Sequence, residues 1–216
     1  MTGKELIARR VAQFFSDGDV VNLGIGLPTL VANYLPEDVD IWLNSENGVL
    51  GICGTAQENI DTDLVDASGV PALLRKGGCC FDSFSSFGLI RGGHVDYTVL
   101  GAYEVDAQDN LANWTVPGKT VAGMGGAMDL TCGARQVLVA TTHTDKDGNP
   151  KILEQCTLPL TAAHEVNYII TELCVLKVAP EGLILMETAP GVTADEVQGK
   201  TAAKLIVPEQ VGGMMA

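Results

Sequence analysis

The spacing of apolar and polar residues predicts alternating helices and strands along the chain. From Leu6 to Phe15 apolar residues recur at helical spacing, which predicts an amphipathic helix through about Asp17. This helix starts at Thr2-Gly-Lys-Glu5, which has the spacing of a capping box, and a second such box at Thr193-Ala-Asp-Glu196 starts a helix to Lys200. A further short helix is expected at 29–34. Apolar or alternating runs predict strands at 20–23, 39–43, 95–100, 136–141, 166–178, 182–187 and 204–207.

Other segments have a weaker pattern. Residues 53–78 are polar and mixed, which predicts a surface loop with little regular structure, whereas the aromatic residues in 79–91 indicate a buried helix or an irregular core segment. The glycines and methionines near the C-terminus predict a loose tail. Because strand and helix patterns alternate, we expect an α/β fold with a mixed, mainly parallel sheet flanked by helices. With no linker or internal repeat in view, we expect one domain over residues 1–216.

Composition narrows the possible environments and partners. The 216 residues are 46% hydrophobic and 19% charged, as in folded globular proteins. A formal net charge of −14 argues against a nucleic-acid partner, which requires clustered Lys and Arg. The sequence has no run of eighteen apolar residues and no signal-peptide pattern, so we expect no membrane span and a cytoplasmic location.

The cysteines and histidines show no metal-binding spacing. In a cytosolic chain the six cysteines are expected to be buried small apolar residues rather than disulfides. His94, His143 and His164 are scattered and form no pair of the H-E-x-x-H kind, so we expect no metal site.

Glu46 is the first candidate for chemistry. It follows the predicted strand 39–43 within Asn44-Ser-Glu-Asn-Gly48, where amides and glycine indicate a tight turn. In open α/β sheets, ligands bind outside the carboxyl ends of the strands, so Glu46 is expected at such a site. From the local pattern alone, a solvated turn carboxylate is the favoured interpretation. Glu104, Asp96 and Asp129 also stand near strand ends or loops, but a solvated loop or a structural partner is favoured for each of them.

The glycine-rich segments allow two interpretations. Gly24-Ile-Gly-Leu-Pro-Thr29 follows the strand 20–23 but has Thr29 in place of the third glycine of a dinucleotide-binding turn, so an NAD site is not expected. It is either a tight strand-to-helix connection or a turn whose backbone borders a ligand. Gly123-Met-Gly-Gly126 has glycines whose amides could face an oxyanion.

Six blocks in order resemble the β subunit of family I (3-oxoacid type) CoA-transferases, and together they extend over roughly residues 4–175. The blocks are Gly24 to Thr29, Ser45 to Gly51, Arg91 to Asp96, Asn110 to Trp114, Val116 to Lys119 and Gly123 to Asp129. The resemblance implies the NagB/RpiA/CoA-transferase-like fold and ping-pong transfer of CoA between carboxylic acids. It also implies that Glu46 is the nucleophile, passing through an anhydride and a glutamyl-CoA thioester.

The remaining site residues are carried over from the same resemblance. Gly125 and Gly126 match the glycine loop near the glutamate and are candidate oxyanion donors. Asn47 is a candidate to orient Glu46, with a plain turn residue as an equal alternative. Four weaker candidates for contacts to substrate or CoA are Asn22, Gly24, Gly26 and Lys119.

Partners and substrates are less constrained. Coenzyme A is expected as a substrate thioester, with no permanently bound cofactor. The α subunits of this family carry a G-x-G-G-F loop, and Gly77-Gly-Cys-Cys-Phe81 is not that motif. We therefore expect a separate α subunit in a heterodimer or heterotetramer. Partly apolar candidate pocket segments with few arginines favour short monocarboxylic acids. The alternatives are a sugar-phosphate isomerase-like protein, which would use a carboxylate base, and a non-catalytic metabolite-sensing module of the same fold.

Overall fold

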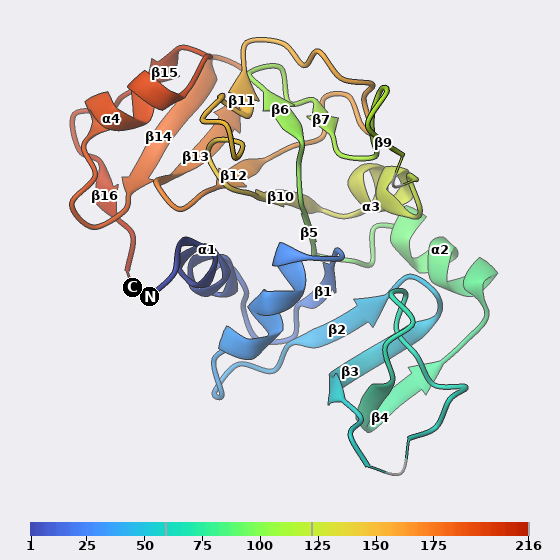
Figure 1. Ribbon diagram of the computed structural model, residues 1–216. Helices are drawn as coiled ribbons and strands as arrows, with labels where there is room; N and C mark the ends of the chain where they lie inside the picture. The colour runs from blue at the N-terminus through green and yellow to red at the C-terminus, as the bar shows by residue number, and fades with distance from the viewer. Residues whose placement is uncertain (59, 122, 216) are drawn as a thin grey trace.

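The computed structural model describes residues 1–58, 60–121 and 123–215, and its backbone is built around one large sheet (Figure 1). The strands of that sheet follow the order β15-β14-β13-β12-β10-β5-β1-β2-β3-β4, with β16 beside β14. Within it β12, β10, β5, β1 and β2 are mutually parallel. The outer pairs β2–β3, β3–β4, β12–β13 and β13–β14 are antiparallel. The expected mixed, mainly parallel sheet is confirmed.

The elements have the following bounds. The helices are α1 Gly3–Ala12, the 3₁₀ helix η1 Leu27–Tyr34, α2 Ser83–Arg91, α3 Ala127–Gly133 and α4 Ala194–Lys200. The large sheet contains β1 Val20–Leu23, β2 Trp42–Ser45, β3 Val49–Thr55, β4 Ala72–Cys80, β5 Tyr97–Leu100, β10 Gln136–Ala140, β12 Tyr168–Ile170, β13 Cys174–Ala179, β14 Gly182–Thr188, β15 Leu205–Ile206 and β16 Gly212–Gly213. Two smaller sheets contain β6 Glu104–Asp106, β7 Leu111–Ala112 and β11 Ile152–Leu153, and β8 Thr115–Val116 with β9 Thr120–Val121.

Both faces of the central strands are covered. Along β10, Val137 and Val139 join one hydrophobic cluster while Leu138 and Ala140 join another, as the two-residue period of a strand requires. The first cluster includes residues of β6, β7, β11 and α4, and the second includes residues of α1 and η1. A sheet buried on both faces explains why the predicted strand at 136–141 is an almost continuous apolar run.

Several expected boundaries were wrong. Both capping boxes form, at Thr2 and at Thr193, but α1 ends at Ala12 and not near Asp17. The strand predicted at 39–43 lies instead at Trp42–Ser45, which brings its end directly to Glu46. The 166–178 run divides into β12 and β13, because Thr171 accepts backbone hydrogen bonds from the turn between them.

The segment expected to be a loop, 53–78, contains the end of β3 and most of β4. Register shifts near Leu50 and Ile52 interrupt the alternation of these paired strands and hide the strand pattern in the sequence. The 79–91 segment includes the helix α2, but Phe84 is 87% exposed, so the expectation of a buried segment was wrong there.

The tail and the cysteines also differ from expectation. Residues 212–213 pair with β14 as β16, and Met214 is buried in the cluster that contains α1, so the tail is not loose. All six cysteines are free thiols, as expected, but Cys174 is buried whereas Cys53, Cys79, Cys80 and Cys132 are exposed.

Candidate active site

A cavity of about 690 Å³ opens at the carboxyl ends of four parallel strands. Its lining includes Glu46 after β2, Gly24 after β1, Gly101 after β5 and Thr141 after β10. β1 lies between β2 and β5, so the chain leaves β1 toward one side of the sheet and later returns on the other side. Ligands of open α/β sheets bind at such a switch in strand order, and the volume is typical of a small-molecule site.

A tight hairpin places Glu46 at this cavity. Ser45 pairs with Val49, so residues 46–48 form the loop between β2 and β3. Gly48 has a φ of +118°, and a Cβ there would lie 2.0 Å from the carbonyl oxygen of Phe81, so no other residue fits this loop. The expected tight turn after a strand is therefore present, and it directs a half-buried Glu46 into the cavity.

Asn22 is the side chain that holds Glu46. Its Nδ2 donates to Oε2 of Glu46 at 3.1 Å and to the carbonyl oxygen of Asn44 at 3.2 Å. Asn22 itself is only 1% exposed and stands on β1, the strand next to β2. A buried amide on a neighbouring strand thus restricts the position of the carboxylate.

The glycine loop also lies close to Glu46. A Cβ at Gly126 would lie 3.2 Å from Cγ of Glu46 and 3.3 Å from the ring of Phe87. Gly125 has a φ of +54°, and both glycines line the cavity just before α3. The structure therefore brings Glu46, Asn22, Gly24, Gly125 and Gly126 together.

Three other predicted residues are not brought to this cavity. Asn47 is exposed, and its Nδ2 donates to the carbonyl oxygen of Val65 at 2.8 Å. Gly26 borders a separate cavity of about 1040 Å³ that is lined in part by η1. Lys119 is exposed in the turn between β8 and β9. The positions of Asn47, Gly26 and Lys119 in the structure therefore give no support to the roles expected for them.

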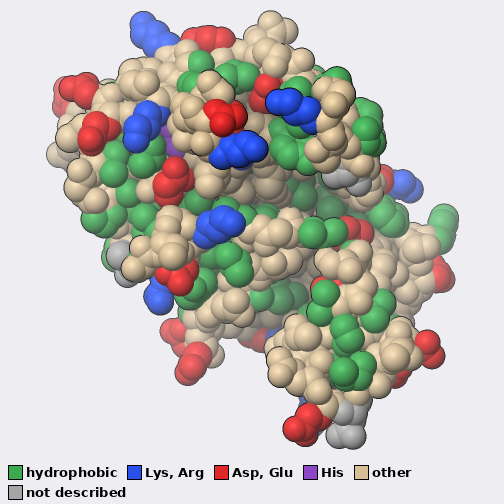
Figure 2. All heavy atoms as spheres, in the orientation of Figure 1, with side chains coloured by type: hydrophobic (Ala, Val, Ile, Leu, Met, Phe, Trp, Pro, Cys, Tyr) green, Lys and Arg blue, Asp and Glu red, His purple; other side chains and the backbone are tan. Residues whose placement is uncertain are grey.

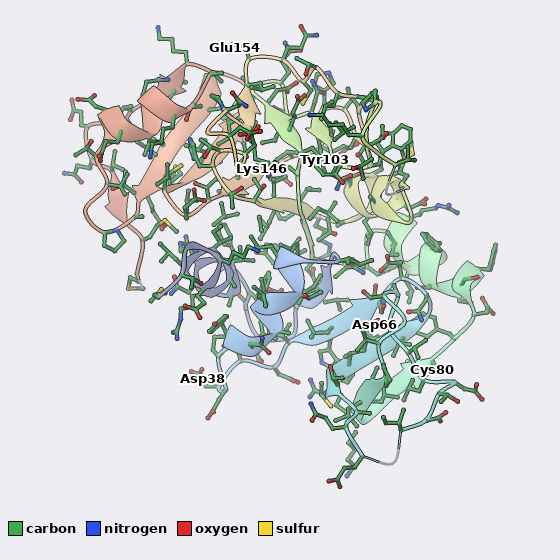
Figure 3. The ribbon with its side chains drawn as sticks, in the orientation of Figure 1. Asp38, Asp66, Cys80, Tyr103, Lys146 and Glu154 are labelled. Atoms are coloured by element: carbon green, nitrogen blue, oxygen red, sulfur yellow. The ribbon has the colours of Figure 1, made fainter. Side chains whose placement is uncertain are left out.

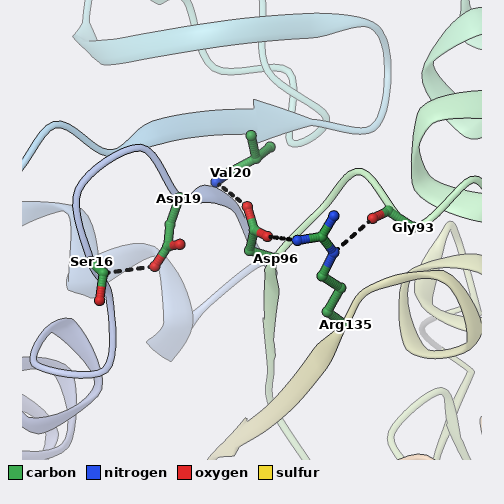
Figure 4. A network of polar contacts seen from close by, with 6 residues as sticks. All are labelled: Ser16, Asp19, Val20, Gly93, Asp96 and Arg135. Carbon is green, nitrogen blue, oxygen red and sulfur yellow. Dashed lines mark hydrogen bonds and ion pairs between the residues drawn. The ribbon is translucent and has the colours of Figure 1, made fainter.

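The carboxylates for which structural roles were favoured do have such roles. Asp96 accepts from the backbone N of Val20 and from Arg135, which also donates to the carbonyl oxygen of Gly93 (Figure 4). Glu104 accepts from Thr157 and Leu158, and Asp129 pairs with Arg91. These contacts join segments far apart in the sequence.

Sequence reasoning missed the polar group on the cavity wall formed by Tyr103, Thr141, Thr142 and Lys151. Nζ of Lys151 donates to Oγ1 of Thr141 at 2.5 Å. Burial lowers the pKa of Lys151, while the charges of Glu172 and Asp145 act in the opposite direction. Thr141 ends a predicted strand, and that position was a usable signal, but Lys151 follows a turn with no local motif.

Among the described residues, no group of three His, Cys, Asp or Glu side chains is placed to hold a metal ion. No helix in the described part of the chain has both the length and the apolar character needed to cross a bilayer. His143 is fully buried between the hydroxyls of Thr171 and Thr201, and burial lowers its pKa to about 4.

Comparison with known proteins decides the family. A family model described as "Coenzyme A transferase" matches residues 4–200. The chain belongs to the coenzyme A transferase family. The expected membership among β subunits of family I CoA-transferases is confirmed, and with it the expectation that the chain is an enzyme subunit.

Related proteins support the same assignment. The chain is 54% identical to the acetate CoA-transferase subunit beta of Haemophilus influenzae, over 97% of this chain and 94% of that one. It is 53% identical to the protein of the same name from Escherichia coli, over 96% and 95%. The crystal structure of the acyl-CoA transferase YdiF from E. coli O157:H7 superimposes with a TM-score of 0.79 at 22% identity, covering 99% of this chain. The chain corresponds to 43% of the YdiF chain, and this likeness confirms the α/β fold.

Proposed function

We propose that this β subunit moves CoA between an acyl-CoA and a free short-chain carboxylic acid, with Glu46 as the nucleophile in a ping-pong mechanism. One observation carries the proposal: a half-buried carboxylate stands in a cavity at the strand ends, held by Asn22 and bordered by Gly126. A carboxylate nucleophile suits the reaction because its anhydride keeps the acyl group activated.

The reaction proceeds through three covalent intermediates, an anhydride, a thioester and a second anhydride. Glu46 attacks the thioester carbonyl of the donor, which forms an acyl-glutamyl anhydride and releases CoA as a thiolate. The thiolate then attacks the glutamyl carbonyl, expelling the donor acid and leaving a glutamyl-CoA thioester. The acceptor carboxylate attacks this thioester, giving a new anhydride and the thiolate, and the thiolate finally takes the acceptor acyl group and restores Glu46.

The neighbours of Glu46 supply positions and donors for these steps. Because Nδ2 of Asn22 binds Oε2, Oε1 is the oxygen left for attack. The same Nδ2 stabilises negative charge on Oε2 when the thiolate adds to the glutamyl carbonyl. The backbone amides of Gly125 and Gly126 serve the carbonyl oxygen of the substrate, and one such donor contributes about 3–4 kcal/mol in a hydrolase. Gly24 lines the cavity wall, and a Cβ there would lie 2.9 Å from the carbonyl oxygen of Val99, so glycine lets this part of the wall pack against β5.

A separate α subunit completes the site in this proposal, in a heterodimer or heterotetramer, with residues 1–216 acting as one β-subunit domain. The names of the bacterial relatives as "subunit beta" support it. On the face shown in Figure 2, Lys and Arg side chains are separated by acidic and neutral ones. CoA carries several phosphates, and a chain of net charge −14 with dispersed basic side chains needs a positive field from elsewhere. CoA enters as a substrate, with no permanently bound cofactor required.

The test is the intact mass of this chain, co-expressed with its α subunit, after brief exposure to acetoacetyl-CoA or butyryl-CoA. We expect a CoA-sized mass gain on this chain that disappears on addition of acetate and is absent in Glu46→Gln. An adduct that persists in Glu46→Gln would keep the reaction class but remove Glu46 as the nucleophile. No adduct with any acyl-CoA, in a folded complex, would refute the mechanism and favour a sensing or isomerase-like function.

A further inference from the structure

Three buried side-chain oxygens have no hydrogen-bond partner in the part of the chain that the structure describes. They are Oδ1 of Asn22 on β1, Oγ of Ser86 on α2 and Oγ1 of Thr98 on β5. Asn22 is 1% exposed, and Ser86 and Thr98 are fully buried. Buried polar groups of native proteins are bonded to protein atoms or to ordered water, and leaving one unbonded is costly. All three oxygens therefore need a partner.

Asn22 and Thr98 lie side by side on one face of the large sheet. They are partners in the parallel register of β1 and β5, so both side chains point to the same face, with the strands about 4.8 Å apart. Val20, two residues before Asn22, also belongs to this face, and it packs against the cluster that contains Ile90 of α2. The face that holds the two oxygens is therefore the one that α2 covers.

α2 runs across this face in the direction opposite to β1. Figure 3 shows Cys80 at the end of β4, shortly before the helix begins. The backbone N of the next residue, Phe81, donates to the carbonyl oxygen of Gly48 at 2.9 Å, in the loop between β2 and β3. The helix thus begins at the carboxyl end of β2. It ends near the amino end of β1, because Ile90 and Val20, the first residue of β1, belong to the same cluster.

This direction places Ser86 above Asn22 and Thr98. Ser86 and Ile90 are four residues apart and both are fully buried, so they share the face of the helix that packs on the sheet. One helical turn from Ile90 to Ser86 covers about 6 Å toward the carboxyl ends of the strands. The two residues from Val20 to Asn22 cover about 6.6 Å in the same direction. The hydroxyl of Ser86 therefore comes over the oxygens of Asn22 and Thr98.

We propose that Ser86 and Thr98 are positioning residues that hold one buried water against Oδ1 of Asn22, behind the bond from Asn22 to Glu46. A buried water makes about three hydrogen bonds to groups that lack other partners, and the three oxygens supply that number. An amide oxygen is an acceptor, so the water donates one hydrogen to Oδ1. Its other bonds go to the two hydroxyls, each of which can donate or accept.

The water fixes which end of the Asn22 amide faces the carboxylate. Nδ2 donates to Oε2 of Glu46 at 3.1 Å and to the carbonyl oxygen of Asn44 at 3.2 Å. With the amide turned over, Oδ1 would face two other acceptors with no proton between them. A donor held at Oδ1 favours the first orientation alone. The inference rests on the proposed function, because the carboxylate that this amide holds is the proposed nucleophile.

The test is a double-mutant cycle on the complex with its α subunit. Thr98→Val and Ser86→Ala each remove one hydroxyl, alone and combined with Asn22→Ala. The rate of CoA-adduct formation is followed by intact mass, kcat and KM are measured separately, and thermal unfolding reports the fold. Thr131→Val is the matched control, because Thr131 is also buried but its hydroxyl donates to two carbonyl oxygens of its own helix, α3.

We expect Thr98→Val and Ser86→Ala each to lower kcat by roughly 2- to 10-fold, the range of one neutral hydrogen bond, with KM nearly unchanged. In the Asn22→Ala background neither substitution should lower kcat further, and Thr131→Val should leave kcat unaltered. Thr98→Ser, which restores the hydroxyl without the methyl group, should recover most of the loss. Full additivity with Asn22→Ala, or a loss in Thr98→Ser equal to that in Thr98→Val, would overturn the proposal.

A high-resolution crystal structure of the complex tests the water without any catalysis. We expect one ordered water within hydrogen-bonding distance of Oδ1 of Asn22 and of both hydroxyls, and we expect Thr98→Val to lose it. Direct packing of these groups with no water between them would refute the site, even if Glu46 forms the adduct. A wild type that holds the water but forms no adduct would support the site while refuting the proposed function.

Discussion

Gly126→Ala tests whether the glycine loop sets the position of Glu46. The added Cβ would lie 3.2 Å from Cγ of Glu46 and 3.3 Å from Cε1 and Cζ of Phe87. Carbon atoms pack at about 3.7 Å, so Glu46 must withdraw by about 0.5 Å. The backbone tolerates alanine, because Gly126 has a φ of −85°. The perturbation is therefore local to the carboxylate and the ring beside it.

This shift is large enough to affect catalysis. The bond from Nδ2 of Asn22 to Oε2 of Glu46 is 3.1 Å long, and hydrogen bonds weaken with small departures from their preferred geometry, so a displacement of the carboxylate by about 0.5 Å would disturb this contact. A 1 Å misplacement of a reacting group can cost about 100-fold, so half that distance should lower kcat/KM by about 10-fold. We expect little change in Tm, because the site is at a cavity edge.

The assay follows CoA-adduct formation by intact mass over time, together with steady-state kcat/KM and thermal unfolding of the complex. Gly88→Ala is the control: it lies on α2, a Cβ there has no atom within 4 Å, and alanine favours the helix. Gly126→Ala with wild-type adduct kinetics and an intact fold would refute the idea that this close approach positions Glu46. The same loss of activity in Gly88→Ala would show a general effect of the neighbouring helix.

Asn22→Ala removes the donor to Oε2 of Glu46, and we expect kcat/KM to fall by roughly 10- to 100-fold, as for loss of one hydrogen bond to a charged group; an unchanged kcat/KM would contradict its role. His143 is buried with its pKa lowered to about 4 from 6.5, so the unfolded chain binds the extra proton first. The free energy of unfolding should therefore fall by about 3 kcal/mol as pH drops from 6.5 to 4; denaturant titrations that show the same slope in His143→Gln would contradict this. Met214→Ala should lower the free energy of unfolding by about 2–3 kcal/mol, because Met214 is 3% exposed, whereas Met215→Ala, at 70% exposure, should have almost no effect; equal effects would refute the packing of the tail.

Local patterns in the sequence determined much of the fold. Capping boxes at Thr2 and Thr193 depend on residues three apart, so their spacing alone predicts where α1 and α4 begin. The apolar run at 136–141 predicted β10, because neighbouring residues alone carry this strand signal. The tight loop at Glu46 followed from its amides and from Gly48, whose φ of +118° suits glycine. Each signal lies within a few residues, where backbone geometry and sequence are directly linked.

Tertiary structure alone decided the features that depend on distant segments. β3 and β4 pair across a long connection with shifted register, so neither shows a regular alternation by itself. Met214 is buried because β16, the strand directly before it, pairs with β14 and holds the end of the chain against the sheet.

The residues of the site also fall into two groups, those identified from the sequence and those that only the fold brings to Glu46. The sequence identified Glu46 and the glycine loop, because their motif is local and resembles that of a known family. The bond from Asn22 to Glu46 joins two parallel strands, and its geometry required the sheet. Lys151 carries no local motif, and it reaches the cavity because β11 pairs with β6, away from the large sheet. The sequence alone therefore determined the family and the proposed nucleophile. The fold decided which charges and hydrogen-bond donors surround that nucleophile, because those groups come from segments more than a hundred residues apart.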